Sequence, residues 1–273
     1  MTIEDEEQEE EVLAVALQAA RAAAAELRAR FGQRPASAEA GVSRGRGIRA
    51  KSGPTDLVSD ADLAAESAIR SVLAERRPGD AILAEEGGAT GAGELRWVVD
   101  PLDGTINFLF GIPVFAVSIA CEDESGTLAG VVLEPIRAEC FAATRSGPAT
   151  LGVEPIRTPA RTELSTALVA TGFSYDARMR ARQAAVLSEV LPRVRDIRRA
   201  GAAAVDLAWT ACGRYDAYYE RGLNPWDFAA GSLIAQRAGL ELRALAAVGE
   251  DPPGLVVAPG ALIDELYGLV AGG

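Results

Sequence analysis

The spacing of hydrophobic residues predicts a first half, up to about residue 150, that mixes helices with a sheet. An acidic start followed by an alanine-rich apolar pattern predicts a long helix that ends near Arg30. A second helix is expected from a cap at Ser59 to about Arg77, with Asp62 in its first turn. Short apolar runs then predict strands, of which the last returns as a hairpin partner, at residues 81–84, 97–99, 114–121, 128–133 and 139–144.

In the second half, apolar runs of strand length alternate with helical periods. Strands are expected at residues 168–171, 194–197, 216–219 and 255–258, and helices at 178–190, 202–212, 227–238 and from 261 onwards. This alternation favours α/β layering. No internal repeat, low-complexity linker or clear boundary divides the sequence. We therefore expect one domain over residues 1–273, with an α+β half (1–150) that merges into an α/β half (151–273).

Glycine and basic residues crowd positions 41–53, between the first two predicted helices. This composition predicts an exposed loop. Such loops often carry functional residues, and Lys51 lies in this one.

The overall charge limits the partners of the chain. A formal net charge of −12 is too negative for a general nucleic-acid binder, which normally presents a basic face. No apolar run approaches the roughly 20 residues that cross a bilayer, and the acidic N-terminus is the opposite of a signal peptide. We expect a cytoplasmic enzyme with no nucleic-acid and no membrane partner.

The chain has no histidine, which removes the usual general base, Ser-His triads and every histidine-ligated zinc or iron site. Its three cysteines, Cys121, Cys140 and Cys212, are far apart and flanked by apolar residues. This pattern indicates buried free thiols rather than ligands or disulfides. Any bound metal must therefore be held by oxygen.

The most informative segment is the end of the predicted strand 97–99, which continues as the sequence DPLDGT. Asp100 and Asp103 can converge around the proline-fixed turn, the carbonyl of Leu102 can turn inward, and Gly104 lets the backbone approach a ligand. Hard cations such as magnesium prefer this all-oxygen set of ligands. Taken alone, the pattern is equally typical of an ordinary aspartate-rich turn.

Two further acidic positions have the same ambiguity. Glu85 and Glu86 follow the predicted strand 81–84 and precede two glycines, so they can supply a carboxylate at a neighbouring strand end or simply be solvated. Asp227 lies in the first turn of a helix opened by the sequence NPW, where a simple N-terminal cap is also expected.

Together these segments resemble the two signature motifs of the inositol monophosphatase family. The first, an apolar strand end followed by Asp-Pro-apolar-Asp-Gly-Thr, is present at residues 99–105 and continues in Asn107 and Phe108. The second, Trp-Asp followed by small residues and glycine, is present at residues 226–231. Ile106 departs from the threonine or valine that is common in the family.

The resemblance covers roughly residues 10–270. Glu85 and Glu86 lie the expected short distance before the first motif, and Lys51 with residues 56–62 resembles the family's upstream segment. The usual glycine-rich turn is replaced by Ser-Gly-Pro at residues 146–148. Because four segments match in the right order, coincidence does not explain the set.

The resemblance implies a layered αβαβα sandwich and a magnesium-dependent phosphoric monoester hydrolase. It implies two magnesium ions bridged by Asp100, and the family also admits a third, looser one near Glu85. The implied metal ligands are Glu85, Asp100, the carbonyl of Leu102, Asp103 and Asp227. With no histidine in the chain, water activated by the metal is the implied nucleophile, and no phosphoenzyme is expected.

Catalytic roles follow from the same resemblance. Glu85 is implied in catalysis through the metal, and Asp62 with Thr105 resembles the pair that orients and deprotonates the water. The N–H groups of Gly104 and Thr105, at a turn into a helical segment, are expected to bind phosphate oxygens. Lys51 resembles a family loop residue that closes over the metals, although an ordinary solvated lysine also accounts for it.

Substrate choice depends on fewer residues. Glu220, in the sequence DAYYE, resembles the inositol-phosphatase version, in which the glutamate accepts hydrogen bonds from ring hydroxyls; a surface glutamate at a strand end is the alternative. Asp103 can also accept from a ring hydroxyl, and Asp227 is assigned to the same substrate site. The turn at Gly201 and Ala202 resembles the one whose backbone touches inositol.

We therefore expect hydrolysis of inositol 1-phosphate to inositol and phosphate by a homodimer, the common assembly of the family, with lithium sensitivity as a family trait. A same-fold phosphatase acting on histidinol phosphate, adenosine 3′,5′-bisphosphate or fructose 1,6-bisphosphate is the first alternative. A regulatory partner of the RNA machinery with secondary catalysis is the second, and the negative charge argues against direct RNA contact.

Overall fold

The computed structural model describes residues 3–32, 49–53 and 56–272 of the chain. Its helices are α1 (Ile3–Arg30), α2 (Asp60–Arg76), α3 (Thr105–Phe110), α4 (Ala177–Val190), α5 (Ala203–Ala211), α6 (Pro225–Arg237) and α7 (Gly260–Ala271). Short 3₁₀ turns occur at η1 (Leu164–Thr166) and η2 (Leu191–Arg193).

The strands of the described residues form three sheets. A small hairpin pairs β1 (Arg49–Gly53) with β2 (Asp56–Val58). The eight-stranded sheet has the spatial order β10 (Glu154–Pro155), β9 (Thr150–Leu151), β8 (Glu139–Thr144), β7 (Gly126–Glu134), β6 (Ala116–Asp123), β5 (Arg96–Asp103), β3 (Ala81–Ala84) and β4 (Gly88–Thr90). The five-stranded sheet has the order β12 (Asp196–Arg198), β11 (Leu168–Thr171), β13 (Ala217–Arg221), β15 (Gly254–Ala258) and β14 (Glu241–Leu245).

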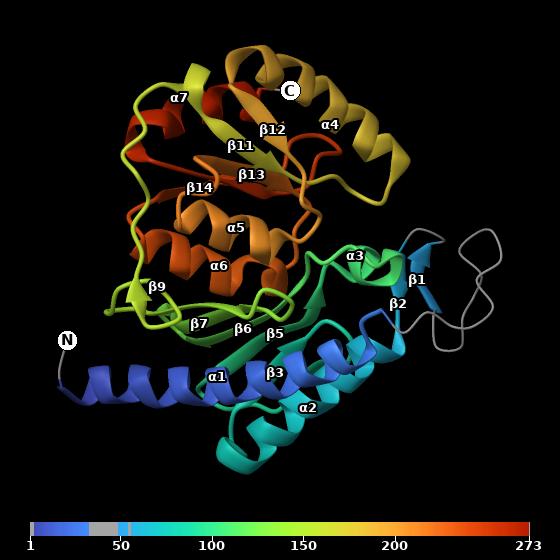
Figure 1. Cartoon of the computed structure of the whole chain (residues 1–273), viewed down its shortest axis with the longest axis vertical. Coiled ribbons are helices and arrows are strands. Elements are labelled where there is room, and N and C mark those ends of the chain that lie inside the picture. Colours follow the sequence, from blue (N-terminus) through green and yellow to red (C-terminus); the bar gives the residue numbers. More distant parts are fainter. Residues whose placement is uncertain (1–2, 33–48, 54–55, 273) are drawn as a thin grey trace.

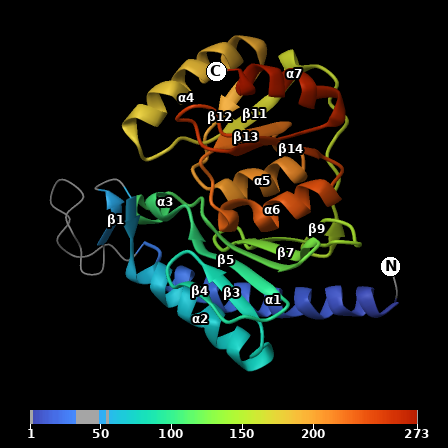
Figure 2. The ribbon, with the colours of Figure 1, turned by 180° about the vertical axis from the view of Figure 1, so that it is seen from behind.

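Helices and sheets alternate in five layers, which both views of the ribbon show (Figures 1 and 2). α1 and α2 cover the outer face of the eight-stranded sheet, and α5 and α6 lie between the two sheets. α4 and α7 cover the far side of the five-stranded sheet. The layered αβαβα sandwich predicted from the sequence is confirmed. Both sheets mix parallel and antiparallel pairs, with β3 parallel to β5 and β11 parallel to β12 and β13.

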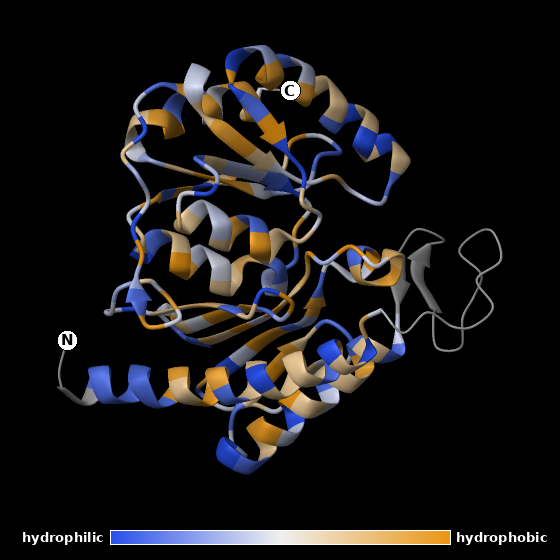
Figure 3. Ribbon diagram, viewed as in Figure 1, coloured by the Kyte–Doolittle hydropathy of each residue, from blue (hydrophilic) through white to orange (hydrophobic). Residues whose placement is uncertain are grey.

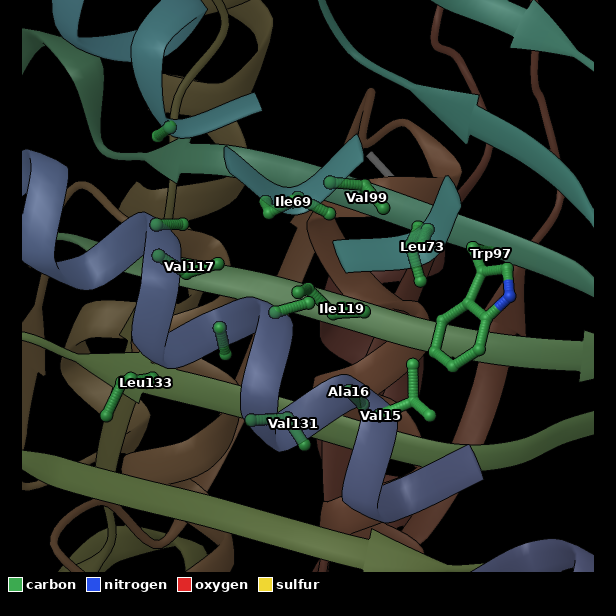
Figure 4. Close-up of a cluster of buried hydrophobic side chains, with 14 of the residues drawn as sticks. Val15, Ala16, Ile69, Leu73, Trp97, Val99, Val117, Ile119, Val131 and Leu133 are labelled. Carbon is green, nitrogen blue, oxygen red and sulfur yellow. The ribbon is translucent and has the colours of Figure 1, made fainter. Parts of the chain in front are cut away.

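Small residues let α1 approach the sheet closely. Its inner face buries a run of alanines completely, whereas its first turns are strongly hydrophilic (Figure 3). Larger side chains of α2 and of the central strands fill the remaining space (Figure 4). Burying each large aliphatic side chain contributes roughly 1.5–3 kcal/mol, so this cluster is a major source of stability. The cluster includes Val15, Ala16, Ile69, Leu73, Trp97, Val99, Val117, Ile119, Val131 and Leu133.

Three sequence predictions need correction. Residues 49–53, predicted as part of a loop, are strand β1, because pairing with β2 satisfies their backbone groups; the rest of the predicted loop, 41–48, lies outside the described residues. The strand predicted at 194–197 begins at Asp196, because η2 prolongs the helical turn after α4. Cys121 is buried, but Cys140 and Cys212 are only half-buried. All three are free thiols, as predicted.

No helix within the described ranges combines the length and the apolar character needed to cross a bilayer.

Candidate active site

A cavity of about 790 Å³ lies where the two sheets and the helices between them meet. Its walls come from the ends of β5 and β13, the first turns of α5 and α6, and the segment 172–177 before α4. The predicted site residues that line it are Glu85, Asp100, Leu102, Asp103, Gly104, Thr105, Gly201, Ala202, Glu220 and Asp227. Residues separated by more than 140 positions therefore share one cavity.

Strand pairing brings the first two carboxylates together. β3 runs parallel to β5 with Ala84 opposite Val99, and the N–H of Glu85 donates to the carbonyl of Val99 (3.1 Å). Glu85 and Asp100 therefore follow directly at neighbouring strand ends, and their carboxyl groups share a hydrogen bond. Asp100 also accepts a hydrogen bond from the N–H of Leu102 (2.9 Å), which shapes the turn.

The turn after Asp103 requires glycine. Gly104 has φ of 92°, in the left-handed region that L side chains rarely adopt. An added Cβ would also lie 3.1 Å from the Cβ of Ala202, so α5 and this turn could not approach each other as closely. Gly104 caps α3, in which Thr105 is the first residue.

Asp227 reaches the same place from α6. Its carboxylate Oδ2 accepts from the N–H of Asn224 (2.7 Å), so the N-terminal capping role considered from the sequence is real. The Oγ of Ser118, which lies opposite Asp100 in the sheet, donates to the carbonyl of Trp226 (3.1 Å). This contact fixes the first turn of α6 beside the end of β5, and Asp227 lines the cavity as well as capping the helix.

The acidic groups repel one another. Burial, then the charges of Glu85, Asp103 and Asp227, raise the pKa of Asp100 well above its ordinary value. Burial likewise raises the pKa of Asp227 well above its ordinary value, against the hydrogen bond from Asn224. The pKa of Asp103 is raised to about 7 by burial, although N–H groups of α5 lower it. A cation would relieve the electrostatic cost of ionising these carboxyl groups.

The donor set fits a hard divalent cation, because it consists of carboxylates and a backbone carbonyl around one cavity. Within the described part of the chain, no group of three or more Asp, Glu or Cys side chains is already arranged closely enough to hold a metal ion.

Asp62 does not line the cavity but lies behind its wall. Its Oδ2 accepts from the N–H (2.8 Å) and Oγ (2.6 Å) of Ser59 in the capping box of α2, as expected from the sequence. Its Oδ1 accepts from Oγ1 of Thr105 (2.9 Å), which also lies 3.1 Å from the carbonyl of Leu102. The fully buried Asp62 thus reaches the cavity through Thr105.

Asp103 and Glu220 present their carboxylates to the cavity from fixed positions. Asp103 accepts from the N–H groups of Ala203 (3.1 Å) and Ala204 (2.7 Å) at the start of α5. Glu220 accepts from the hydroxyl of the buried Tyr218 (2.7 Å), and burial raises its pKa to about 7. A Cβ on Gly172 would overlap the carboxylate of Glu220, so only glycine leaves it this position.

The sequence predictions missed several residues of this cavity. Tyr218 and Gly172 act on Glu220, while Asp206, Arg180 and Arg199 line the wall. Only Asp206 had a signal in the sequence, because it is an acidic residue within an otherwise apolar helix. Lys51 lies on β1, and its side chain is outside the part of the chain that the structure describes.

Comparison with known proteins agrees with this geometry. Residues 8–263 match the model of the inositol monophosphatase family. An inositol-1-monophosphatase of Mycobacterium leprae is 44% identical over 249 residues, which cover 88% of this chain and 85% of that protein. A Nus factor SuhB of Pseudomonas aeruginosa is 46% identical over 195 residues, 67% of this chain and 70% of that protein.

The fold has a close counterpart among solved structures. The crystal structure of extragenic suppressor protein SuhB from Bartonella henselae matches with a TM-score of 0.86 at 34% sequence identity. The match covers 96% of this chain and 99% of that chain. Because the family model spans most of the sequence and the relatives match along most of their lengths, the chain belongs to the inositol monophosphatase family.

Proposed function

We propose that this protein hydrolyses inositol 1-phosphate to inositol and phosphate with the help of magnesium. The family is generally magnesium-dependent, and the relative from Mycobacterium leprae is named for this activity. The observation that carries the proposal is the shared cavity, in which the carboxylates of Asp103 and Glu220 stand beside the acidic cluster of Glu85, Asp100 and Asp227.

The acidic cluster is assigned to the metal. Glu85, Asp100, Asp103, Asp227 and the carbonyl of Leu102 would hold two magnesium ions, with Asp100 shared, and a third looser ion near Glu85 is part of the proposal. Bound magnesium would supply positive charge that neutralises the phosphate dianion, and it would lower the pKa of water so that the water loses a proton and becomes a better nucleophile. The N–H groups of Gly104 and Thr105 are assigned to the phosphate oxygens.

Proton transfer is assigned to Thr105 and Asp62. Thr105 Oγ1 already donates to Asp62 Oδ1, so it can accept a proton from water while its own proton passes to Asp62. The hydrogen bonds from Ser59 hold the other carboxylate oxygen in place. The chain offers no histidine for this role.

The polyol is assigned to a second group of residues that line the cavity. Glu220 and Asp103 would accept hydrogen bonds from ring hydroxyls, and the turn at Gly201 and Ala202 would contact the ring. Because the hydroxyl of Tyr218 donates to one carboxylate oxygen of Glu220, the other oxygen of Glu220 is available to the substrate. We also include a homodimer in the proposal, on the basis of the family.

The proposal is tested by phosphate release from inositol 1-phosphate, histidinol phosphate, adenosine 3′,5′-bisphosphate and fructose 1,6-bisphosphate, each with magnesium and with a chelator. A chelator-sensitive preference for inositol 1-phosphate supports it. A preference for another ester keeps the metal assignment and overturns the substrate.

A second candidate function rests on the relative named Nus factor SuhB. In this case the protein would act mainly as a partner of the RNA machinery. Stoichiometric recovery of transcription proteins with the tagged chain, together with no magnesium-supported turnover of any ester, would favour this function over the first.

A further inference from the structure

Asp206 is an acidic residue in a place where apolar residues are expected. It lies in α5, whose other residues are mostly alanine, valine and leucine, and it is only 1% exposed. It nevertheless lines the cavity that holds the proposed active site. A buried carboxyl group in such a helix costs stability unless a partner compensates it.

The Oδ1 atom of Asp206 has no such partner. It is buried and makes no hydrogen bond within the described ranges of the chain. The backbone of the same residue is fully used, because its N–H donates to Ala202 and its carbonyl accepts from the hydroxyl of Thr210 (2.7 Å). Buried polar atoms without a partner are rare in native proteins, and each one needs an explanation.

The surroundings of Asp206 indicate what the missing partner is. Burial raises its pKa well above the ordinary value, and the charges of Glu220 and Asp103 raise it further, whereas Arg199 lowers it. Asp206 also lines the same cavity as both carboxylates that we assign to the polyol. Asp103 is held by the first N–H groups of α5, and Asp206 lies one turn further along that helix.

We propose that Asp206 is a third carboxyl contact for the polyol and that its Oδ1 binds a ring hydroxyl different from those bound by Asp103 and Glu220. This inference rests on the proposed function. Each hydroxyl has one hydrogen to donate, so three carboxyl groups on separate elements can each read a different hydroxyl of a cyclic polyol. A site built in this way rejects analogues that lack a hydroxyl, because its own buried group then stays unpaired.

The test compares the variant Asp206→Ala with the matched control Thr210→Ala. Thr210 is equally buried in the same helix but does not line the cavity. For each protein, kcat and KM are measured with inositol 1-phosphate, with the set of monodeoxy-inositol 1-phosphates and with 4-nitrophenyl phosphate, which has no ring hydroxyl.

Asp206→Ala is expected to lower kcat/KM for inositol 1-phosphate by about 3- to 10-fold, mainly through KM, because one hydrogen bond to the substrate is lost. Turnover of 4-nitrophenyl phosphate is expected to stay within about threefold of the wild-type value, because this substrate has no ring hydroxyl that Asp206 could bind. The loss should disappear for the one monodeoxy analogue that lacks the contacted hydroxyl. Thr210→Ala should lower the melting temperature without changing the order of substrates.

Equal losses with inositol 1-phosphate and 4-nitrophenyl phosphate, or a loss that no monodeoxy analogue removes, would overturn the role of Asp206. If Asp206→Ala fails to fold, Asp206→Asn is used instead. We expect this variant to discriminate less than wild type against the same monodeoxy analogue. Unchanged discrimination would overturn the role of Asp206. If the wild-type protein shows no preference for inositol 1-phosphate, the proposed function fails first and the role of Asp206 fails with it.

Discussion

Thr105 and Asp62 are 43 positions apart, yet the hydroxyl of Thr105 donates a 2.9 Å hydrogen bond to the Asp62 carboxylate. Thr105 is the first residue of α3 and Asp62 is the third residue of α2, so the hydrogen bond joins the first turns of two helices. A carboxylate placed by a capping box thus acquires a second contact in the site.

The first prediction concerns this pair. Thr105→Val keeps the shape of the side chain but removes the hydroxyl that links Asp62 to the cavity. We expect kcat with inositol 1-phosphate to fall by about 10²- to 10⁴-fold, the usual contribution of general acid–base catalysis. The measurement is steady-state phosphate release at saturating magnesium.

Ser59→Ala is the control for the Thr105 variant. It weakens the capping box, which costs roughly 1 kcal/mol of stability, but leaves the hydrogen bond between Thr105 and Asp62 in place. It also removes one of the two hydrogen bonds from Ser59 to Asp62, so turnover should fall, but far less than in Thr105→Val. If Thr105→Val is no slower than Ser59→Ala, the proton-transfer role is wrong.

The second prediction separates metal binding from folding. Asp100→Asn removes one charge from the repelling cluster, so the metal-free variant should melt at a temperature equal to or above that of wild type. Magnesium should raise the melting temperature of wild type and not of the variant, because only bound ligand stabilises the folded state. Turnover should be abolished. A normal magnesium-induced shift in the variant would remove Asp100 from the metal site.

The third prediction concerns pH. Burial raises the pKa of Glu220 from 4.5 to about 7. The stability linked to this group is therefore fully present below about pH 4.5 and is lost as the pH rises through about 7. Glu220→Gln does not titrate, so its melting temperature relative to wild type should increase between about pH 5 and about pH 8 when both are measured in chelator. A difference that is constant or decreases would contradict the assignment.

The fourth prediction concerns Gly172. Its Cβ would overlap the carboxylate of Glu220, so Gly172→Ala should displace that side chain without straining the backbone. We expect a loss of about tenfold in kcat/KM for inositol 1-phosphate, with little loss for 4-nitrophenyl phosphate. Gly268→Ala, which would meet open space in α7, is the matched control and should leave both substrates unchanged. Equal losses on both substrates in Gly172→Ala would remove Glu220 from substrate selection.

Strong local signals made much of the fold predictable. The cap at Ser59 with Asp62 three residues later marked the start of α2, and the apolar runs of β3, β8 and β11 were bounded correctly. β14 was missed, because at the edge of its sheet it alternates polar and apolar residues and carries no continuous apolar run. Its existence depends on pairing with β15 rather than on its own sequence.

The candidate site was predictable where a motif carried it. Asp100, Asp103 and Asp227 stood in recognisable segments, and the structure brings them to one cavity. Tyr218 and Gly172 could not be found in this way, because their importance comes from contacts with Glu220 that only the folded sheet creates. The role of Lys51 and the organisation as one catalytic domain remain predictions.

The central claim is that the acidic cluster binds magnesium for the hydrolysis of inositol 1-phosphate. The most direct measurement is phosphate release from inositol 1-phosphate by the full chain, with magnesium and then with excess chelator, beside the same assay on Asp100→Asn. Rapid release that the chelator stops and that Asp100→Asn lacks is the expected result. Release that continues in chelator, or that Asp100→Asn sustains at a normal rate, would contradict the claim.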